Sequence, residues 1–418
     1  MMATNRGLIS SYRVLDLTNE NGYLCGEILA EMGADVIKIE NPRGDSGRQI
    51  GPFYQQTPDL EKSLYWFAYN LNKRGITLDI ETEDGRQILT RLIKKADFII
   101  ESFPPGYLAN LGLSFTKIHE INPRIVMTSI TPFGQTGPYK DYKGSDLVVM
   151  AMSGLMYITG DPDKAPLRIS FPQAFLLASA HAAASSMIAH YYRETGGEGQ
   201  HVDVSAREVV LWEIANGMPL WQLNQIIYKR AGSFLSGRWS DAKQRLLWPC
   251  KDGYVSFYIL GGPSGIKTNI AIVKWLVEKD AAPDYLKQFN WNTLDMSKQT
   301  QAMQDRLEKP IGEFFMRFTK AELYAESAKR GIMLYPVCNA QDIQENVQLK
   351  ARDYWVNVDH PALSTSITYP GVFARLSETP LTINKRAPVI GEHNLDIYEG
   401  ELGFTRTELG ALHQSGVI

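Results

Sequence analysis

Cysteine is scarce in this sequence, which has only Cys25, Cys250 and Cys338 among 418 residues. The three are odd in number and far apart, so they form neither a disulfide framework nor a ligand set with metal-site spacing. We therefore expect reduced thiols, no metal site and a cytoplasmic location.

The sequence also lacks an excess of charge of either sign. Its 43 basic residues face 46 acidic residues, which gives a formal net charge of -3. This balance provides no electrostatic attraction for a polyanion. We expect no nucleic-acid partner.

Clean membrane-length hydrophobic runs are missing as well. The stretch from Gln173 to Tyr192 approaches the required length, but it contains Gln, Ser and His. Such a composition suits a helix buried between other elements. Residues 1–18 have no apolar run behind Arg6 that could serve as a signal peptide. We therefore expect no membrane partner.

The first half of the sequence contains short β-rich apolar segments that alternate with helical patterns. Leu24, Ile28, Leu29 and Met32, for example, recur at helical spacing. Strands separated by helices form βαβ units, whose strands are parallel. We predict an α/β, doubly wound first domain. Its expected strands are 13–18, 34–40, 76–80, 96–102 and 124–131, with a helix at about 83–95.

A second, smaller domain is predicted beyond residue 205. The chain is long enough for two domains, and a new strand pattern, DGYVSFYIL, occurs at 252–260. Residues 336–364 are mixed and polar, which is typical of a long return connection.

Gly22, Gly26 and Glu40 reproduce part of a dinucleotide-binding fingerprint. A complete G-x-G-x-x-G is missing, so the glycines have two interpretations. We favour close packing of a helix on a strand over a hydride-transfer enzyme with a dinucleotide.

Seven blocks together resemble the class III coenzyme A (CoA) transferases, a group that includes formyl-CoA and carnitine-CoA transferases and the related acyl-CoA racemases. The blocks occur in the family's order and extend from residue 13 to the C-terminal region. They are RVLDLT, CGEILAEMGADVIKIENPRGD, YNLNKRGITLDIETEDGR, ESFPPGYLANLGLSFTKIHEINPRIVMTSITPFGQTGP, GSDLVVMAMSGLM, GGEGQHVDVSAREV and RAPVIGEHN.

The resemblance implies a Rossmann-like large domain and a smaller α/β domain, with two chains interlocked like rings. We accordingly expect a large domain at 1–205, completed by 385–418, and a small domain at 225–330. Residues 206–224 and 331–384 are expected to be linkers.

The resemblance also implies covalent catalysis by an aspartate that opens a long helix of small residues. The family pattern is similar to R-V-G-x-P-V-A-D-L-L-A-G, and here the stretch is RISFPQAFLLAS, residues 168–179. Phe175 occupies the nucleophile position. A phenyl ring cannot be acylated, so we expect no catalytic nucleophile in this chain.

Nearby polar residues are weaker candidates for catalysis. Asp161 and Asp163 lie in a Gly- and Pro-containing turn, and for Asp146 we favour a structural hydrogen-bonding role. Racemisation is disfavoured because Ser145 stands where that branch has histidine. We interpret His181 and His190 as packed or surface residues.

By family analogy, the residues that border CoA are Asn21, Gly22, Leu78, Ser102, Phe103 and Asn110. Asn41, Glu81 and Asn110 replace basic residues of well-known members, which removes charge that would pair with the phosphates of CoA. Residues 259–267, ILGGPSGIK, are either a loop that covers the active site or an ordinary connection.

Two functions are consistent with these observations. We favour a non-catalytic subunit of a heteromeric CoA-transferase, supporting a homologous, aspartate-bearing partner. Its most specific form moves CoA from succinyl-CoA to an aromatic dicarboxylate such as benzylsuccinate. CoA is then a substrate, and no cofactor is expected. The alternative is a stand-alone acyl-CoA-binding pseudoenzyme or regulatory protein.

Overall fold

The structure is a computed structural model that describes residues 7–235 and 242–418, and these residues form two units. The first unit contains the chain up to Leu155 together with Arg168–Gln225 and Gln348–Ile418. The second contains Met156–Leu167 and Ile226–Val347. The chain therefore leaves the first unit and returns to it twice.

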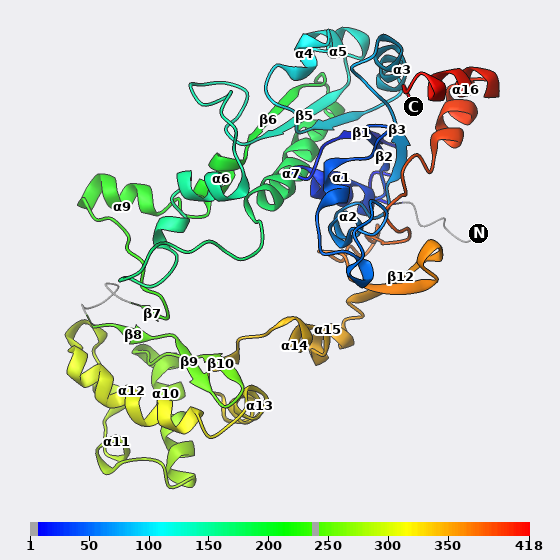
Figure 1. Cartoon of the computed structure of the whole chain (residues 1–418). Helices are drawn as coiled ribbons and strands as arrows, with labels where there is room; N and C mark the ends of the chain where they lie inside the picture. Colours follow the sequence, from blue (N-terminus) through cyan, green and yellow to red (C-terminus); the bar gives the residue numbers. More distant parts are fainter. Residues whose placement is uncertain (1–6, 236–241) are drawn as a thin grey trace. The chain divides into compact units, whose positions relative to one another are not determined.

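A parallel six-stranded sheet forms the centre of the first unit (Figure 1). Its strand order is β3-β2-β1-β4-β5-β6, which is the order of doubly wound nucleotide-binding domains. The α/β fold class and the five strands predicted for this sheet are confirmed, except that the third strand, expected at 76–80, is displaced toward the N-terminus, at 74–77. The strands are β1 (Arg13–Leu17), β2 (Asp35–Glu40), β3 (Arg74–Thr77), β4 (Phe98–Glu101), β5 (Val126–Thr131) and β6 (His201–Ser205).

Helices cover both faces of this sheet, so its central strands are buried. All residues of β4 and β5 are buried. Helices α3 and α5 contact each other on one face, while α1 and α7 contact each other on the other (Figure 1). The helices that lie wholly in this unit are α1 (Tyr23–Glu31), α2 (Leu64–Tyr69), α3 (Glu83–Ile93), α4 (Tyr107–Asn110), α5 (Phe115–Ile121), α6 (Asp146–Met152), α7 (Ala174–Glu194), α8 (Ala206–Trp212), α9 (Gly217–Asn224) and α16 (Arg406–Gln414).

The long helix α7 begins at Ala174, after the non-helical segment 168–173. Pro172 disfavours the helical conformation at Phe171, the residue before it, which agrees with the non-helical segment. Small side chains such as Ala178 and Ala182 are fully buried, and they let the helix approach the sheet and α1 closely. No helix among the described residues is long and apolar enough to cross a membrane.

The C-terminal segment completes the first unit. The Tyr398 hydroxyl donates to the carbonyl of Thr77 at 2.6 Å, and Glu401 accepts from Arg74 and Arg13, both at 2.7 Å. Tyr398 and Glu401 belong to the π-helix η7 (Asp396–Glu401). A hairpin of β12 (Trp355–His360) and β13 (Thr365–Pro370) precedes them in the sequence. These contacts of Tyr398 and Glu401 anchor the C-terminal segment to the edge strand β3.

The second unit has a three-stranded antiparallel sheet, ordered β11-β10-β9, with helices packed around it. Its core is rich in large aromatic side chains, including Trp248, Trp275 and Phe314. The predicted strand 252–260 is shorter and is β10. The elements are β7 (Phe234–Leu235), β8 (Gln244–Arg245), β9 (Leu247–Cys250), β10 (Gly253–Ser256), β11 (Tyr335–Pro336), α10 (Gly262–Glu278), α11 (Asp284–Lys287), α12 (Gln301–Phe315), α13 (Lys320–Arg330) and α14 (Ala340–Gln344).

The limits of the units differ from those expected for domains and linkers. Residues 206–224, expected as a linker, form α8 and α9 of the first unit. The linker expected at 331–384 is divided at α15 (Val347–Ala351) between the two units. The linker is divided because its two parts contact different units. Strand β11 pairs with β10 in the second unit, whereas Val358 and Tyr369 of the β12–β13 hairpin share a hydrophobic cluster with Trp66 of the first unit.

Candidate functional site

A cavity of about 220 Å³ opens at the carboxyl ends of β1, β2 and β3, where doubly wound sheets bind ligands. Leu78 and Phe103 line it, as the resemblance implied. The Ser102 hydroxyl donates to the side-chain oxygen of Asn19 at 2.8 Å, and Asn19 also lines the cavity. The structure therefore groups three of the six predicted CoA-binding residues at one place.

Asn21 and Gly22 lie in the turn after β1, beside this cavity but not in its lining. The Asn21 amide donates to Asn19 at 3.0 Å. A Cβ atom on Gly22 would come within 2.4 Å of the Thr18 side chain, so this position requires glycine. Asn110, at the exposed end of α4, is not among the lining residues, and its role stays a prediction.

Two residues at this cavity are functional candidates that the sequence did not single out. Tyr107 stacks on Phe103, with 4.5 Å between the ring centroids and 27° between the ring planes. Asn19 connects β1 to β4, since its backbone amide also donates to the hydroxyl oxygen of Ser102 at 2.8 Å. Asn19 follows the end of β1, and Tyr107 follows the end of β4. Their position after a predicted strand is the feature of the sequence by which they could have been found.

The charges that line the cavity are negative. Glu40, Asp45, Asp79 and Glu81 supply four carboxylates, and no Lys or Arg belongs to the described lining. Arg48 forms a bidentate pair with Glu40 at 2.7 and 2.8 Å, with both side chains buried. Glu81 instead accepts from the Tyr107 hydroxyl at 2.9 Å.

Asp45 is balanced by a buried cation. Its carboxylate pairs with Lys38 at 3.0 Å. Burial opposes ionisation of Asp45, but Lys38 and hydrogen bonds hold the pKa of the Asp45 carboxyl below its usual value. Asp79 and Glu81 therefore remain as the lining carboxylates that form no ion pair with a described Lys or Arg. An anionic ligand would meet net negative charge here.

Phe175 is the second residue of α7 and is buried, with 6% of its surface exposed. The N-terminal amides of this helix are occupied by Asp146, whose Oδ1 accepts from Gln173 at 2.6 Å and from Ala174 at 2.7 Å. A carboxylate at this place is stabilised by the helix dipole. Asp146 therefore makes hydrogen bonds of the kind expected for a structural role.

The start of α7 is connected to the turn after β1. Ser179, one helical turn beyond Phe175, donates from its hydroxyl to the carbonyl of Asn21 at 3.3 Å. Residues four apart share one face of a helix. The Phe175 position is thus one turn from the polar contacts beside the cavity, although Phe175 itself does not line it.

The other polar candidates have structural contacts. His190 is buried between Tyr12 and Phe98 and contacts Arg193 at 2.8 Å. Burial, followed by the charge of Arg193, lowers the pKa of the His190 imidazole. His181 contacts the carbonyl of Leu177 at 2.9 Å. His190 is thus packed in the core and His181 is half-buried, so both fit the interpretation as packed or surface residues.

Asp161 and Asp163 belong to the second unit, where Asp161 pairs with Lys164 at 3.3 Å. Residues 259–267 form the connection from the β10 region into α10, which begins at Gly262. Whether this connection covers an active site stays a prediction. No cluster of metal-ligating side chains occurs in the described part of the chain.

Comparison with known proteins identifies a family. The family described as CoA-transferase family III matches residues 9–394. The chain is 34% identical to succinyl-CoA:(R)-benzylsuccinate CoA-transferase subunit BbsE of Thauera aromatica, over 98% of each chain. It is 31% identical to succinyl-CoA--D-citramalate CoA-transferase of Chloroflexus aurantiacus, over 95% of this chain and 94% of that protein. The crystal structure of a CAIB/BAIF family protein from Brucella suis superposes with a TM-score of 0.80 at 27% identity, covering 94% of this chain and 99% of that one.

Proposed function

Because the chain belongs to CoA-transferase family III, we propose that it is the non-catalytic subunit of a heteromeric CoA-transferase. Its partner is a homologous chain that carries the aspartate nucleophile. The complete enzyme moves CoA from succinyl-CoA to an aromatic dicarboxylate such as benzylsuccinate. We place this enzyme in the cytoplasm.

Phe175 is the single observation on which this proposal rests. It lies at the start of α7, where family resemblance puts the nucleophile, and its ring is buried. The ring has neither a lone pair to attack a thioester nor a proton to exchange. In addition, Asp146 already accepts from the helix amides that would hold an incoming anion. Covalent catalysis therefore requires another chain.

The cavity supports the same division of labour. CoA carries a diphosphate and a ribose phosphate, and proteins usually bind such groups with Lys, Arg or helix N-termini. The lining instead offers Asp79 and Glu81, which form no ion pair with a described Lys or Arg. The predicted CoA-binding residues of this chain thus favour weak binding of CoA, and the productive CoA site belongs to the partner.

The relatives supply the substrate class. The protein from Thauera aromatica is named as a subunit, and its named substrates are succinyl-CoA and (R)-benzylsuccinate. The protein from Chloroflexus aurantiacus is also named for succinyl-CoA, with D-citramalate as the second substrate. The shared donor supports succinyl-CoA, and both named second substrates are dicarboxylates.

The proposed chemistry begins on the partner. Its aspartate carboxylate attacks the thioester carbonyl of succinyl-CoA and expels CoA thiolate, which leaves a mixed anhydride. The thiolate then attacks the aspartyl carbonyl and releases succinate. The acceptor carboxylate attacks the resulting aspartyl thioester and again frees the thiolate, which finally attacks the acceptor carbonyl and restores the aspartate. The present chain would orient the acceptor for these attacks without itself forming a covalent bond.

The test uses this chain together with its aspartate-bearing homologue. The two are co-purified, incubated with succinyl-CoA and treated with hydroxylamine, and the modified peptide is identified by mass spectrometry. We expect a hydroxamate only on the partner's aspartate and no transferase activity from this chain alone. A modified carboxylate in this chain, at Asp146 or elsewhere, would overturn the proposal, as would failure of the two chains to associate.

A further inference from the structure

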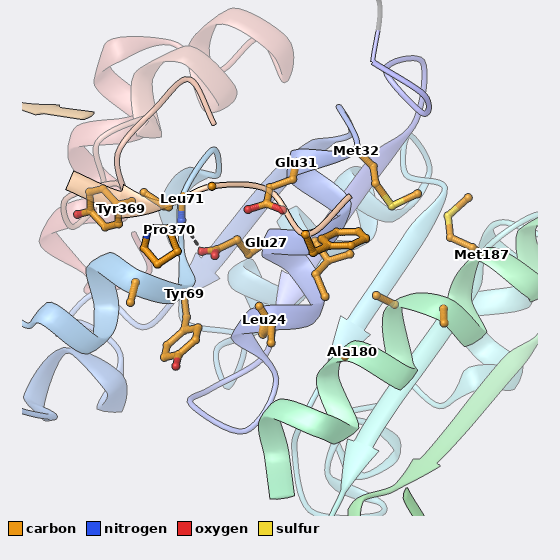
Figure 2. A pocket seen from close by; sticks show the side chains of 16 residues that line it. Leu24, Glu27, Glu31, Met32, Tyr69, Leu71, Ala180, Met187, Tyr369 and Pro370 are labelled. Carbon is orange, nitrogen blue, oxygen red and sulfur yellow. Dashed lines mark hydrogen bonds between the residues drawn. The ribbon is translucent and has the colours of Figure 1, made fainter. Parts of the chain in front are cut away.

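Two cavities of the first unit that are larger than the one at the strand ends differ in their lining. One, of about 700 Å³, lies between α1 and α7 and is lined mainly by apolar side chains, with Glu27 and Glu31 as its carboxylates (Figure 2). The other, of about 360 Å³, is lined by Lys73, the residue before β3, and by residues of β12 and of segment 383–393. We call it the β3 cavity. Its lining carries charges of both signs, and these charges indicate what it can bind.

Two of the cations at the β3 cavity are neutralised by carboxylates of this chain. Lys73 pairs with Asp16 at 2.8 Å, and both side chains are fully buried. Arg386 forms a bidentate pair with Glu392, at 2.8 and 2.9 Å. Because both pairs are complete, neither cation requires a negatively charged ligand.

Lys385 and Asp359 are the charged residues of this lining that form no ion pair with a described residue. Both are exposed. Asp359 belongs to β12, whereas Lys385 belongs to the segment that follows the β12–β13 hairpin. The β3 cavity thus offers one positive and one negative group to a ligand.

His393 adds a hydrogen-bond donor to this cavity. Its Nδ1 accepts from the backbone amide of Gly75 at 3.1 Å, so the ring proton is on Nε2, which bonds to no described residue. Burial lowers the pKa of the His393 imidazole despite the nearby Glu392, so the ring is neutral at pH 7. The charge of Lys385 also lowers this pKa, which places Lys385 near the ring.

Hydrogen bonds to Asn72 fix one wall of the β3 cavity. The side-chain oxygen of Asn72 accepts from the backbone amides of Asn384 and Lys385 at 2.8 and 3.0 Å. Its side-chain nitrogen donates to the carbonyl of Thr382 at 2.7 Å. A ligand therefore meets a wall that is already ordered, which lowers the entropic cost of binding.

The lining combines these polar groups with apolar surface. Val358 and Ile383 belong to it and are 6% and 9% exposed. A dicarboxylate would bring its second carboxylate toward Asp359, and a diamine would bring its second cation toward Lys385. A zwitterion with an apolar group matches both free charges and the apolar surface. The volume of the β3 cavity is sufficient for such a small molecule.

We propose that the β3 cavity binds a free α-amino acid with an apolar side chain. The ammonium group of Lys385 and the Nε2–H of His393 bind its carboxylate, and Asp359 accepts from its ammonium group. Its side chain packs on Val358 and Ile383. The inference goes beyond the proposed function, because it requires neither CoA nor an aspartate-bearing homologue.

Isothermal titration calorimetry with the full chain at pH 7 tests this assignment, with L-leucine as the probe. We expect L-leucine to bind with a dissociation constant below about 1 mM, which a ligand of this size can reach. Two analogues of leucine lack one charged group each: 4-methylpentanoate has no ammonium group, and 3-methylbutylamine has no carboxylate. Each should bind at least about tenfold more weakly, because it loses a charge-assisted hydrogen bond.

Substitutions assign each charge of leucine to its partner. Lys385→Met should weaken the binding of leucine at least about tenfold and abolish the preference for leucine over 3-methylbutylamine. Asp359→Asn should weaken it to a similar extent and abolish the preference over 4-methylpentanoate. Both side chains are exposed, so neither substitution disturbs the core. Lys350→Met and Asp353→Asn change exposed residues outside the lining and should leave the dissociation constant unchanged.

Three results would overturn this inference. They are no binding of L-leucine at millimolar concentration, equal binding of either analogue, and a dissociation constant for leucine that Lys385→Met or Asp359→Asn leaves unchanged. None of these measurements involves CoA or a second chain. Their outcomes are therefore independent of whether the proposed heteromer exists.

Discussion

Single side chains determine which chemistry the first unit can perform, and Phe175 is the decisive one. Its ring is buried at the start of α7, one turn before the contact of Ser179 with Asn21. Substitution by a carboxylate would place a second negative charge beside Asp146, which already occupies the helix amides. The position is therefore adapted to an apolar side chain.

We predict that Phe175→Asp destabilises the chain without creating a transferase. Loss of a buried phenylalanine alone removes roughly 1.5–3 kcal/mol of transfer free energy. The free energy of unfolding, measured by urea titration, should fall by at least that amount. Phe175→Leu is the matched control and should lose less than about 1.5 kcal/mol. Robust transferase activity of the isolated Phe175→Asp chain would contradict the idea of a non-catalytic subunit.

Glu101 offers a pH-dependent prediction at the end of β4. The residue is 4% exposed, and burial raises the pKa of its carboxyl from 4.5 to about 7. The folded state therefore retains a proton that the unfolded state has released. Stability falls as the pH rises from about 4.5 to 7, and the loss is complete above that range.

Glu101→Gln should remove this loss, because the amide oxygen can still accept from the Phe103 amide. The variant should gain roughly 2–3 kcal/mol over the wild type at pH 8 and little at pH 4. Thermal melts across this range measure the difference. Glu313→Gln, at an exposed position on α12, is the control. Equal gains at both pH values would show that Glu101 is not the titrating group.

At the scale of elements, α7 depends on a residue that lies outside it. Asp146, the first residue of α6, supplies the acceptor for two N-terminal amides of α7. The α7 helix has no side-chain cap of its own at Gln173. The sequence 168–173 contains no acidic residue that could serve instead.

We predict that Asp146→Ala frays the first turn of α7. Loss of a capping acceptor costs about 1–2 kcal/mol. Hydrogen exchange should accelerate at residues 173–178, while the C-terminal half of α7 keeps its protection. Asp146→Asn retains an oxygen acceptor and should show a smaller effect. Asp163→Asn, in the second unit, should leave α7 unchanged, and uniform acceleration along α7 would contradict a local cap.

Local patterns predicted the parallel sheet well, because β1 to β5 are apolar segments whose period is visible without tertiary information. The start of α7 was predictable only in part, since the small residues of 168–187 do not mark where the helix begins. The cap from Asp146 could not be located, because it joins residues 27 and 28 positions apart.

The sequence predicted where the strands near the candidate site end, but not which of the residues after these ends line the same cavity. Leu78 and Phe103 meet because β3 and β4 end at one edge of the sheet. Asn110 follows the same block of sequence, yet α4 carries it away from the cavity. The negative lining was visible only in part from Glu81, since Asp45 and Asp79 reach the cavity through turns of the tertiary fold.

At the scale of the whole molecule, the first unit is closed by its C-terminal segment. Glu401 connects Arg13 and Arg74, and Tyr398 reaches the carbonyl of Thr77. Ile397 and Tyr398 are fully buried. The edge strand β3 would lose these partners if the segment were removed.

We predict that truncation before Asp396 destabilises the first unit selectively. Differential scanning calorimetry should show its transition at a lower temperature, while the transition of the second unit, whose core is separate, stays in place. Tyr398→Phe removes one hydrogen bond and should cost only about 1 kcal/mol. A uniform shift of both transitions would contradict the independence of the two units.

The discontinuous first unit also constrains how the protein is made. Tyr398 follows its partner Thr77 by 321 residues. At roughly 5–20 residues per second, a ribosome needs about 15–60 s to cover that distance. During this time β3 has emerged without its final contacts, whereas the long segment 226–347 of the second unit is completed first. The nascent chain therefore passes through a stage in which its later-encoded unit can fold before its earlier-encoded one, and chaperones have an unfinished sheet edge to shield.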